Sequence, residues 1–369
     1  MASSRSRRTR LSPLYLLVFL LAAVALYLFQ SGALSCTGIF PPEVISVTPG
    51  DWVAVHFTSP DSTSGAQQAG LDTLLAADID AARESVDIAA FDFDLERVAG
   101  ALLDAHGRGV DVRMVIDSEN LADEQVKWIT DELTAAGIPI VYDDRQALMH
   151  DKFAIIDQAI LWTGSWNLTE NGTYENNNNA LRFAIPELAA NYTVEFEEMF
   201  FDDAFGTTSP ENTPYPELLL SDDSRIETYF SPEDNARARI LQHLRGADTE
   251  IVFMAFSFTD DEMGRVLLEK ARQGVYVHGV FESRGAGGEY SEYALLRDAG
   301  LDVRLDGNPR SMHHKVFIID GRITIAGSYN FTASAAEDND ENVLIIENAD
   351  LAHAYLQEFD RVYRAGQEE

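Results

Sequence analysis

The chain contains an internal repeat, and this repeat restricts the possible folds more than any other feature of the sequence. Segment 150–157 recurs as segment 313–320, displaced by 163 residues, and both copies read His-x-Lys-x4-Asp. A Gly-Ser turn and an asparagine follow each copy at matching positions. Repeats should be sought first because they set the architecture. A repeat that keeps the same polar residues at fixed spacing indicates two halves of one active site.

The repeat extends well beyond these motifs and predicts an α/β fold. At 369 residues the chain exceeds the usual size of a single core, so two domains or two fused halves are expected. Strands alternating with helices of about ten residues indicate βα units and a largely parallel or mixed sheet that is covered on both faces. Short apolar runs, suited to buried central strands, lie within the motifs at 153–156 and 316–319.

The elements predicted on this basis occur in matching pairs. Helices are expected over 71–82, 95–105, 236–244 and 262–271. Strands are expected over 86–93, 110–116, 251–258 and 275–281, with further strands after the motifs at 159–163 and 323–326. The first half is assigned to 51–205 and the second to 226–369. Segment 206–225, rich in Pro, Ser, Thr and acidic residues, is interpreted as the linker between them.

Residues 1–35 have the pattern of a targeting segment. Four arginines precede an apolar run from Leu14 to Phe29, which suits a long signal peptide or a membrane anchor. The only cysteine, Cys36, follows Ala33-Leu34-Ser35, an arrangement similar to a bacterial lipoprotein box with the leucine displaced by one position. We therefore expect an extracytoplasmic protein that is membrane-anchored, lipoprotein-like or secreted. A single cysteine excludes an internal disulfide.

The charge balance bears on the substrate. The formal net charge is −34, which disfavours nucleic acid because a phosphate backbone is normally bound by a basic surface. Only four lysines occur in the chain, and two of them, Lys152 and Lys315, occupy the same place in the two motifs. Since arginine supplies most other positive charges, this pattern indicates that a compact ammonium group is needed there.

The repeated residues suit the chemistry of a phosphodiester. Side chains alternate along a strand, so His150 and Lys152 project onto one surface, as do His313 and Lys315. The lysines would hold the non-bridging oxygens, with one histidine attacking phosphorus and the other protonating the leaving oxygen. Further candidates for binding the phosphate lie in the two Gly-Ser turns, namely Asn167, Asn330, Ser165 and Ser328.

No metal or other cofactor is expected. Two lysines beside the histidines would repel a cation, and no carboxylates occur at ligand spacing. Asp157 and Asp320 are counted with the catalytic motifs, but their place at the strand end suits fixing the turn by hydrogen bonds. His314 points away from its neighbours on the strand and is expected to be structural.

The doubled His-x-Lys-x4-Asp pattern followed by Gly-Ser closely resembles the phospholipase D superfamily, and the resemblance covers roughly residues 51–365. It implies two tandem α/β/α sandwich halves related by a pseudo-twofold axis, with a single shared active site and a covalent phosphohistidine intermediate. It further implies that His150 is the nucleophile and His313 the general acid and then base. The family places an acidic residue after the turn to orient a histidine of the other half. Glu341 matches this position in the second half, whereas Asn178 stands at the equivalent place in the first.

Four functions remain open at this point. The first is a metal-independent phospholipase D-like phosphodiesterase acting on phospholipid at a membrane surface, where the N-terminal segment would hold it. The alternatives are a nuclease of the same superfamily, a cardiolipin-synthase-like phosphatidyl transferase, and an extracellular binding module without activity. Because one chain carries both motifs, a monomer is sufficient to complete the site.

Overall fold

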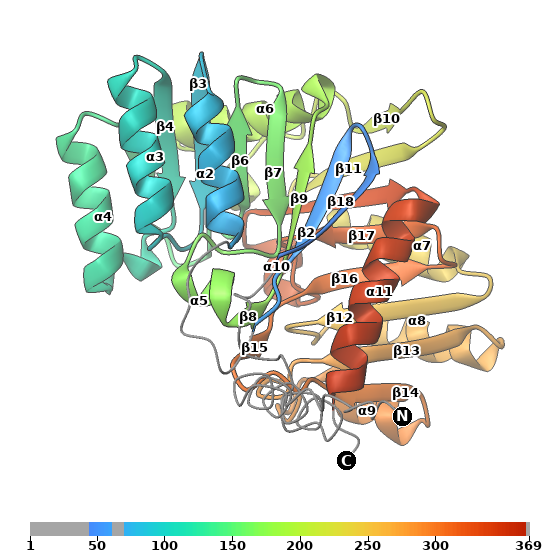
Figure 1. The fold of residues 1–369 in the computed structure, drawn as a ribbon. Helices are drawn as coiled ribbons and strands as arrows, with labels where there is room; N and C mark the ends of the chain where they lie inside the picture. Colours follow the sequence, from blue (N-terminus) through green and yellow to red (C-terminus); the bar gives the residue numbers. More distant parts are fainter. Residues whose placement is uncertain (1–43, 61–69, 367–369) are drawn as a thin grey trace, which may run out of the picture. The chain divides into compact units, whose positions relative to one another are not determined.

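The computed structural model describes residues 44–60 and 70–366, which contain two eight-stranded mixed sheets (Figure 1). The strand order is β1-β2-β9-β7-β6-β3-β4-β5 in one sheet and β10-β11-β18-β17-β16-β12-β13-β14 in the other. These orders match strand for strand, so the internal repeat corresponds to a repeated topology. The prediction of an α/β fold with two similar halves is confirmed.

The first half contains these elements in chain order: β1 (Ile45–Gly50), β2 (Val53–Phe57), α2 (Leu71–Ala81), β3 (Ser85–Ala90), α3 (Glu96–Gly107), β4 (Asp111–Ile116), the 3-10 turn η1 (Glu119–Ala122), α4 (Glu124–Ala135), β5 (Ile140–Tyr142), β6 (Lys152–Ile156), β7 (Ile160–Gly164), α5 (Glu170–Tyr174), β8 (Asn176–Asn177), β9 (Asn179–Phe183) and α6 (Pro186–Asp202).

The second half repeats the order of the strands of the large sheet and of the α-helices, whereas η2 and β15 lie at other places than η1 and β8. It contains η2 (Gly206–Thr208), β10 (Glu217–Leu219), β11 (Arg225–Ser231), α7 (Ala236–Gly246), β12 (Glu250–Ala255), α8 (Asp261–Arg272), β13 (Tyr276–Phe281), α9 (Glu292–Asp298), β14 (Asp302–Leu305), β15 (Ser311–Met312), β16 (Lys315–Ile319), β17 (Ile323–Gly327), α10 (Ala333–Glu337), β18 (Glu341–Glu347) and α11 (Ala349–Ala365).

Three hydrophobic cores follow from the alternation of side chains along the central strands. On β6, Phe153 and Ile155 face a core shared by both halves, whereas Ala154 and Ile156 face a core belonging to the first half alone. Strand β16 divides its side chains in the same way between the shared core and one of the second half. Burial on both faces explains why both strands read as continuous apolar runs.

Helices α6 and α11 contribute to the shared core and join the halves. Tyr192 of α6 packs edge to face against Phe230 of β11, with ring centroids 5.0 Å apart. Tyr355 of α11 packs in the same way against Phe57 of β2, at 5.1 Å. The remaining long helices cover the outer faces, α2, α3 and α4 on the first sheet and α7, α8 and α9 on the second. The two halves are therefore fixed to each other by a continuous apolar core.

The start of the first half and the linker differ in detail from the sequence-based assignment. Strand β10 lies inside segment 206–225 and pairs with β11, so part of that segment belongs to the second sheet. Strand β1 begins at Ile45, before residue 51. Segment 1–35 and Cys36 lie outside the described residues. Across 44–60 and 70–366, none of the helices has the length and apolar character needed to cross a bilayer.

Candidate active site

The two His-x-Lys motifs lie at equivalent edges of the two sheets. Lys152 pairs with Ala90, the last residue of β3, and Lys315 pairs with Ala255, the last residue of β12. Each motif therefore begins where the carboxyl end of a neighbouring strand leaves its sheet, which is the usual edge for ligand sites in α/β proteins. His150, the residue that opens the first motif, is only 5% exposed.

Each half holds the histidine of the other half by its backbone. The N–H of His150 donates to the carbonyl of Asp340, at 2.9 Å, and the N–H of His313 donates to the carbonyl of Asn177, at 2.8 Å. Next to the second contact, β15 pairs with β8 as a short parallel ladder between the halves. The backbone thus brings both motifs together at one centre.

The side-chain partners of the two histidines also come from opposite halves. Nδ1 of His150 lies 2.8 Å from Oε2 of Glu341. Nδ1 of His313 lies 2.9 Å from Oδ1 of Asn178 and 3.0 Å from the carbonyl of Ser165. A proton on each Nδ1 satisfies these oxygens and leaves each Nε2 free, as a nucleophile or an acid needs. Glu341 and Asn178 therefore each contact the histidine of the opposite half at Nδ1, and their orienting role stays a prediction.

The partners make the two histidines chemically unequal. Nδ2 of Asn178 donates to the carbonyl of Gly172, so its oxygen is the atom that faces His313. This amide fixes the tautomer of His313 without adding a charge. Glu341 is fully buried, and burial raises the pKa of its carboxyl group to about 8. This carboxyl group is therefore a better proton acceptor for Nδ1 of His150 than an exposed carboxylate would be.

Burial and like charge act on the histidines and lysines together. Burial, followed by the charges of Lys152 and Lys315, holds the pKa of His150 well below its usual value. The pKa of His313 is lowered by burial and by the same two ammonium groups. Burial lowers the pKa of Lys152 to about 8, and both burial and the charge of Lys152 lower the pKa of Lys315. All four groups are buried, so an anion bound beside them would bring compensating charge.

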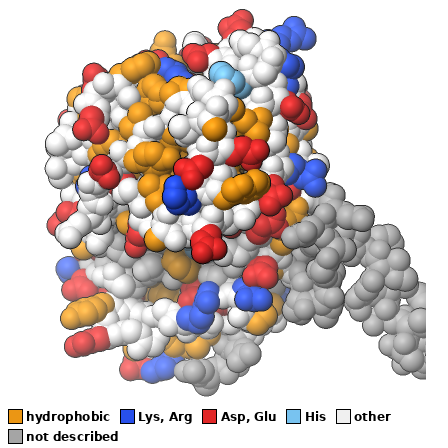
Figure 2. Space-filling view, turned by 90° about the vertical axis from the view of Figure 1, so that its left-hand side faces the viewer, with side chains coloured by type: hydrophobic (Ala, Val, Ile, Leu, Met, Phe, Trp, Pro, Cys, Tyr) orange, Lys and Arg blue, Asp and Glu red, His pale blue; other side chains and the backbone are white. Residues whose placement is uncertain are grey.

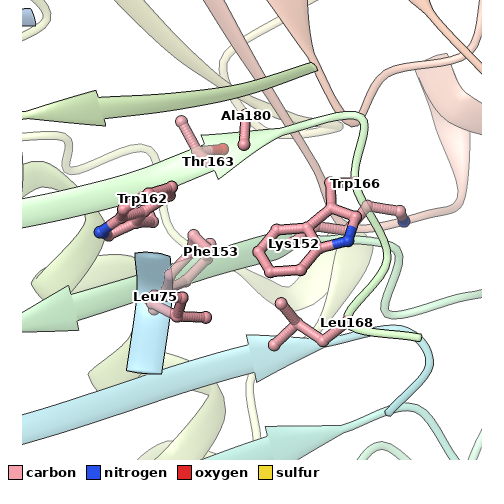
Figure 3. Close-up of a pocket in the computed structure, with 9 residues that line it drawn as sticks. Leu75, Lys152, Phe153, Trp162, Thr163, Trp166, Leu168 and Ala180 are labelled. Carbon is pink, nitrogen blue, oxygen red and sulfur yellow. The ribbon is translucent and has the colours of Figure 1, made fainter. Parts of the chain in front are cut away.

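The lysines donate to their own motifs. Nζ of Lys152 donates to the carbonyl of His150 at 2.7 Å, and Nζ of Lys315 donates to that of His313 at 3.0 Å. An ammonium group carries three N–H bonds, so each lysine keeps donors for a ligand. On the outer side, an apolar cavity of about 10 Å³ borders the stem of Lys152 (Figure 3). It is lined mainly by apolar and aromatic side chains, among them Trp162, Trp166 and Leu168. Such surroundings account for the lowered pKa of this lysine.

The serines of the Gly-Ser turns have a different role from the phosphate binding predicted for them. The hydroxyl of Ser165 donates to Oδ1 of Asn178 at 2.8 Å, and that of Ser328 donates to Oε2 of Glu341 at 2.7 Å. Each hydroxyl also accepts a bond from the backbone of β9 or β18. Their protons are thus committed to the residues that orient the histidines, so the serines brace the site instead of donating to a phosphate.

The glycine of each turn is required by the same close packing. A Cβ atom on Gly164 would lie 2.4 Å from the carbonyl oxygen of Asn179, and one on Gly327 would lie 2.1 Å from that of Asn342. Only glycine lets each turn approach β9 or β18 this closely. Asn167 and Asn330 follow these turns, and their amide oxygens are buried without a hydrogen-bond partner. Their assignment to phosphate binding stays a prediction.

Asp157 and Asp320 do not reach the site, which corrects their place among the catalytic residues. Asp157 accepts three backbone N–H bonds from residues 83–85, at 2.7 to 3.1 Å, and Asp320 accepts three from residues 248–250. Each lies at the far end of its strand, roughly 20 Å along the chain from the histidine of its motif. These carboxylates fix the turn before β3 and β12, as their position at the strand end suggested.

The residues that directly follow the two motif histidines differ between the halves. His314 accepts from Nδ2 of Asn179 at 2.9 Å and donates from Nε2 to Glu358 at 3.0 Å. The equivalent residue of the first half is Asp151, whose Oδ1 accepts from Nδ2 of Asn342 at 2.6 Å. His314 thus faces the interior, consistent with a structural role.

Two aromatic residues at the site were not singled out from the sequence. Phe91 and Phe256 directly follow β3 and β12 at equivalent places of the repeat, and each ring contacts the histidine and lysine of its own half. Their equal positions beside the motif strands were the available signal. Separately, residues 44–60 and 70–366 contain no group of three or more His, Cys, Asp or Glu side chains arranged to hold a metal ion.

The fold and the site define a duplicated α/β protein in which each half supplies one His-Lys pair to a common centre. A family model described as "Cardiolipin synthase, PLD-like domain" matches residues 75–200 and again residues 240–363, and each stretch contains one motif. The chain belongs to the phospholipase D superfamily.

Individual relatives align over shorter stretches. The human mitochondrial cardiolipin hydrolase is 36% identical over 130 residues, which is 35% of this chain and 52% of that protein. A phospholipase D of Rickettsia felis is 34% identical over 164 residues, 44% of this chain and 80% of that protein. The chain thus spans about half the length of the human relative.

A solved structure shows the same fold over nearly the whole chain. The phosphatidylserine synthase of Haemophilus influenzae superposes with a TM-score of 0.66 and covers 88% of this chain and 89% of that one. At 12% identity this likeness speaks for the fold alone.

Proposed function

We propose that this protein is a phosphodiesterase of the phospholipase D type, which needs no metal and hydrolyses phospholipid-like diesters through a covalent phosphohistidine. The observation that carries the proposal is the pairing of His150 with the buried carboxyl group of Glu341 across the halves, opposite a His313 held only by neutral oxygens. One histidine is thereby prepared as a base and nucleophile, and the other as an exchangeable acid.

The first step forms a bond between Nε2 of His150 and phosphorus and breaks the bond from phosphorus to the leaving alcohol. Glu341 accepts the Nδ1 proton of His150 and stabilises the positive charge that grows on the ring. The leaving oxygen takes a proton from Nε2 of His313, which is charged when the anionic diester is bound. Lys152 and Lys315 neutralise the charge that spreads over the non-bridging oxygens.

The second step reverses these roles. Neutral His313 takes a proton from water, the water oxygen bonds to phosphorus, and the bond to His150 breaks. An alcohol in place of water would give transfer instead of hydrolysis by the same steps.

A lipid-like substrate is favoured over nucleic acid by three observations. Relatives that share about a third of their residues with this chain are named cardiolipin hydrolase and phospholipase D. The net charge of −34 opposes binding to a long polyanion. On the face shown in Figure 2, basic side chains of the described residues are interspersed with acidic ones and form no continuous stripe. We also propose that segment 1–35 holds the protein at the outer side of a membrane, where it would lie beside this substrate.

The first experiment is hydrolysis of bis(p-nitrophenyl) phosphate by the full chain in excess EDTA. Wild type is expected to release p-nitrophenol, and His150→Ala is expected to lose this activity. His313→Ala is expected to accumulate a phosphoryl adduct on His150, because p-nitrophenolate leaves without a proton. Intact-mass measurement after an alkaline quench detects the adduct. No metal-free activity in wild type, or an adduct that accumulates in His150→Ala and not in His313→Ala, would overturn the proposal.

The second experiment separates the substrates. The same preparation is given cardiolipin vesicles, phosphatidylcholine vesicles and plasmid DNA, with His150→Ala as the control for each. Phospholipid is expected to be cleaved, with phosphatidic-acid-type products. Cleavage of DNA with untouched lipid would identify a nuclease, and phosphatidyl transfer to added glycerol without hydrolysis would identify a transferase.

A further inference from the structure

Two phenylalanine rings contact the reacting groups of the site in the same way. The ring of Phe91 lies edge to face with the imidazole of His150, with centroids 4.9 Å apart and planes at 64°. The ring of Phe256 lies against His313 at 4.5 Å and 65°. Both rings are partly buried and directly follow β3 and β12.

The same rings lie beneath the lysines. Nζ of Lys152 is 5.0 Å from the centre of the Phe91 ring, and Nζ of Lys315 is 4.6 Å from the centre of the Phe256 ring. Both distances are within the range of a cation–π contact. A single ring in each half therefore touches both groups that are proposed to act on the phosphodiester.

We propose that Phe91 and Phe256 are positioning residues, which keep the two buried ammonium groups charged and fix the rotation of the two imidazole rings. This inference rests on the phosphodiesterase chemistry proposed above and extends it to a second set of residues. Neither ring needs to touch the reacting atoms.

The two ammonium groups are buried without a close counter-ion. Lys152 and Lys315 are 3% and 2% exposed, and no carboxylate of the described residues lies within 4.0 Å of either nitrogen. A buried charge without a close counter-ion tends to lose its proton. The negative face of a phenyl ring supplies part of the missing compensation without adding an acceptor that would compete with a phosphate.

The contacts of each ammonium group also leave one N–H bond for a substrate. One N–H of Lys152 is used by the carbonyl of His150, and the ring of Phe91 occupies a second side of the ammonium group. The remaining N–H is left for an oxygen of the substrate. Phe256 limits Lys315 in the same way.

The phenylalanine rings also restrict the rotation of the two imidazole rings. A hydrogen bond at Nδ1 alone leaves the imidazole free to swing about that contact. The ring edge of Phe91 or Phe256 blocks this swing and so keeps Nε2 directed at the common centre. A fixed direction of attack is what catalysis by orientation requires.

The scarcity of lysine makes a direct test possible. With four lysines in the chain, ¹³Cε-lysine labelling gives four signals, and Lys127→Arg and Lys270→Arg identify the two that lie outside the site. The titration must be compared between variants that keep the other charged groups around the lysines. These groups are Glu341, Asp151, Asp117, Asp92, Lys315 and His150.

Phe91→Leu keeps apolar volume but removes the ring face, so the pKa of Lys152 is expected to fall by about 0.5 to 1 unit. Phe256→Leu is expected to lower the pKa of Lys315 in the same way. Phe91→Tyr should restore the wild-type titration because it restores the ring. The matched control is Phe93→Leu, a fully buried phenylalanine two residues away in the core of the first half. Within 44–60 and 70–366, its ring makes no aromatic or cation–π contact with the histidines or lysines of the motifs. It should reduce stability without moving the lysine titration.

Unchanged lysine titrations in Phe91→Leu and Phe256→Leu would overturn the inference, as would equal shifts in Phe93→Leu. This readout does not need an active enzyme. If wild type hydrolyses no diester, the proposed function fails, while the titrations still decide the role of the rings. If wild type is active, Phe91→Leu should lower kcat/KM more at pH 8 than at pH 6, because a less basic Lys152 is deprotonated in a larger fraction of the enzyme at the higher pH.

Discussion

Replacing Glu341 with glutamine removes the carboxyl group that faces Nδ1 of His150 and gives the first histidine an amide partner, as the second already has. A hydrogen bond to a charged group contributes about 1.5 to 3 kcal/mol, and we place this energy mainly in the step that makes His150 positive. The variant should therefore lose roughly 10- to 100-fold in kcat/KM on bis(p-nitrophenyl) phosphate.

Although Glu341→Gln should be less active, it is expected to be more stable than wild type at pH 8. The carboxyl group of Glu341 has a pKa near 8 in the folded protein against an ordinary value of 4.5. For an acid whose pKa is raised by folding, stability is lost as pH rises from the lower value to the higher one. For this group the loss is on the order of 5 kcal/mol at most when the pH exceeds 8. Glutamine cannot ionise, so the variant should unfold at a higher temperature than wild type at pH 8, with a smaller difference at pH 5.

Glu358→Gln is the matched control, since Glu358 is also a buried glutamate hydrogen-bonded to a histidine, His314, away from the reacting face. Although burial opposes it, His314 and Arg361 hold the pKa of Glu358 below its usual value. This variant should lose stability at pH 8 and keep kcat/KM close to wild type. The reasoning is refuted if Glu341→Gln keeps the wild-type kcat/KM, or if it is destabilised equally at pH 5 and pH 8.

Three further outcomes are expected. Asn178→Asp places a carboxylate at Nδ1 of His313, which should raise the pKa of that histidine and move the alkaline limb of the pH–rate profile to higher pH; an unmoved limb would contradict the role given to His313. Asp157→Ala removes the acceptor of three backbone N–H bonds, so chemical denaturation should show a loss of about 1 to 3 kcal/mol with kcat unchanged below the transition. Burial and nearby carboxylates, including Asp151, hold the pKa of Glu195 well above its usual value, so wild type should lose stability as pH rises above 4.5. Glu195→Gln should weaken this loss, and equal thermal midpoints for both proteins from pH 5 to 8 would show that the carboxyl group is not responsible.

The sequence predicted the repeated elements well because strand and helix periods survive in both copies. The strands at 153–156 and 316–319 were recognisable because burial on both faces leaves an apolar run, and they correspond to β6 and β16. Strand β10 was read as linker because it is three residues long and mostly exposed, so no period distinguishes it. It is a strand only because β11 offers it an edge.

Two features of the site could not be predicted from the sequence, the role of the serines and the contacts of Phe91. Hydroxyl groups donate to a phosphate or to a neighbouring side chain with equal ease, so the sequence could not decide the role of Ser165 and Ser328. Their partners Asn178 and Glu341 lie 13 residues further along, across a turn. Phe91 looked like an ordinary strand residue because its contact with Lys152 depends on the pairing of β3 with β6.

The exchange of orienting residues between the halves has a consequence for how such a chain can evolve. A single-copy ancestor that dimerises must give both histidines the same partner, since the two subunits are identical. Fusion of two copies removes that restriction. Because Asn178 acts on His313 and Glu341 acts on His150, a substitution in one copy alters the chemistry of the other. Neither half separated from the other is expected to be a miniature enzyme, and selection on each copy is exerted through its neighbour.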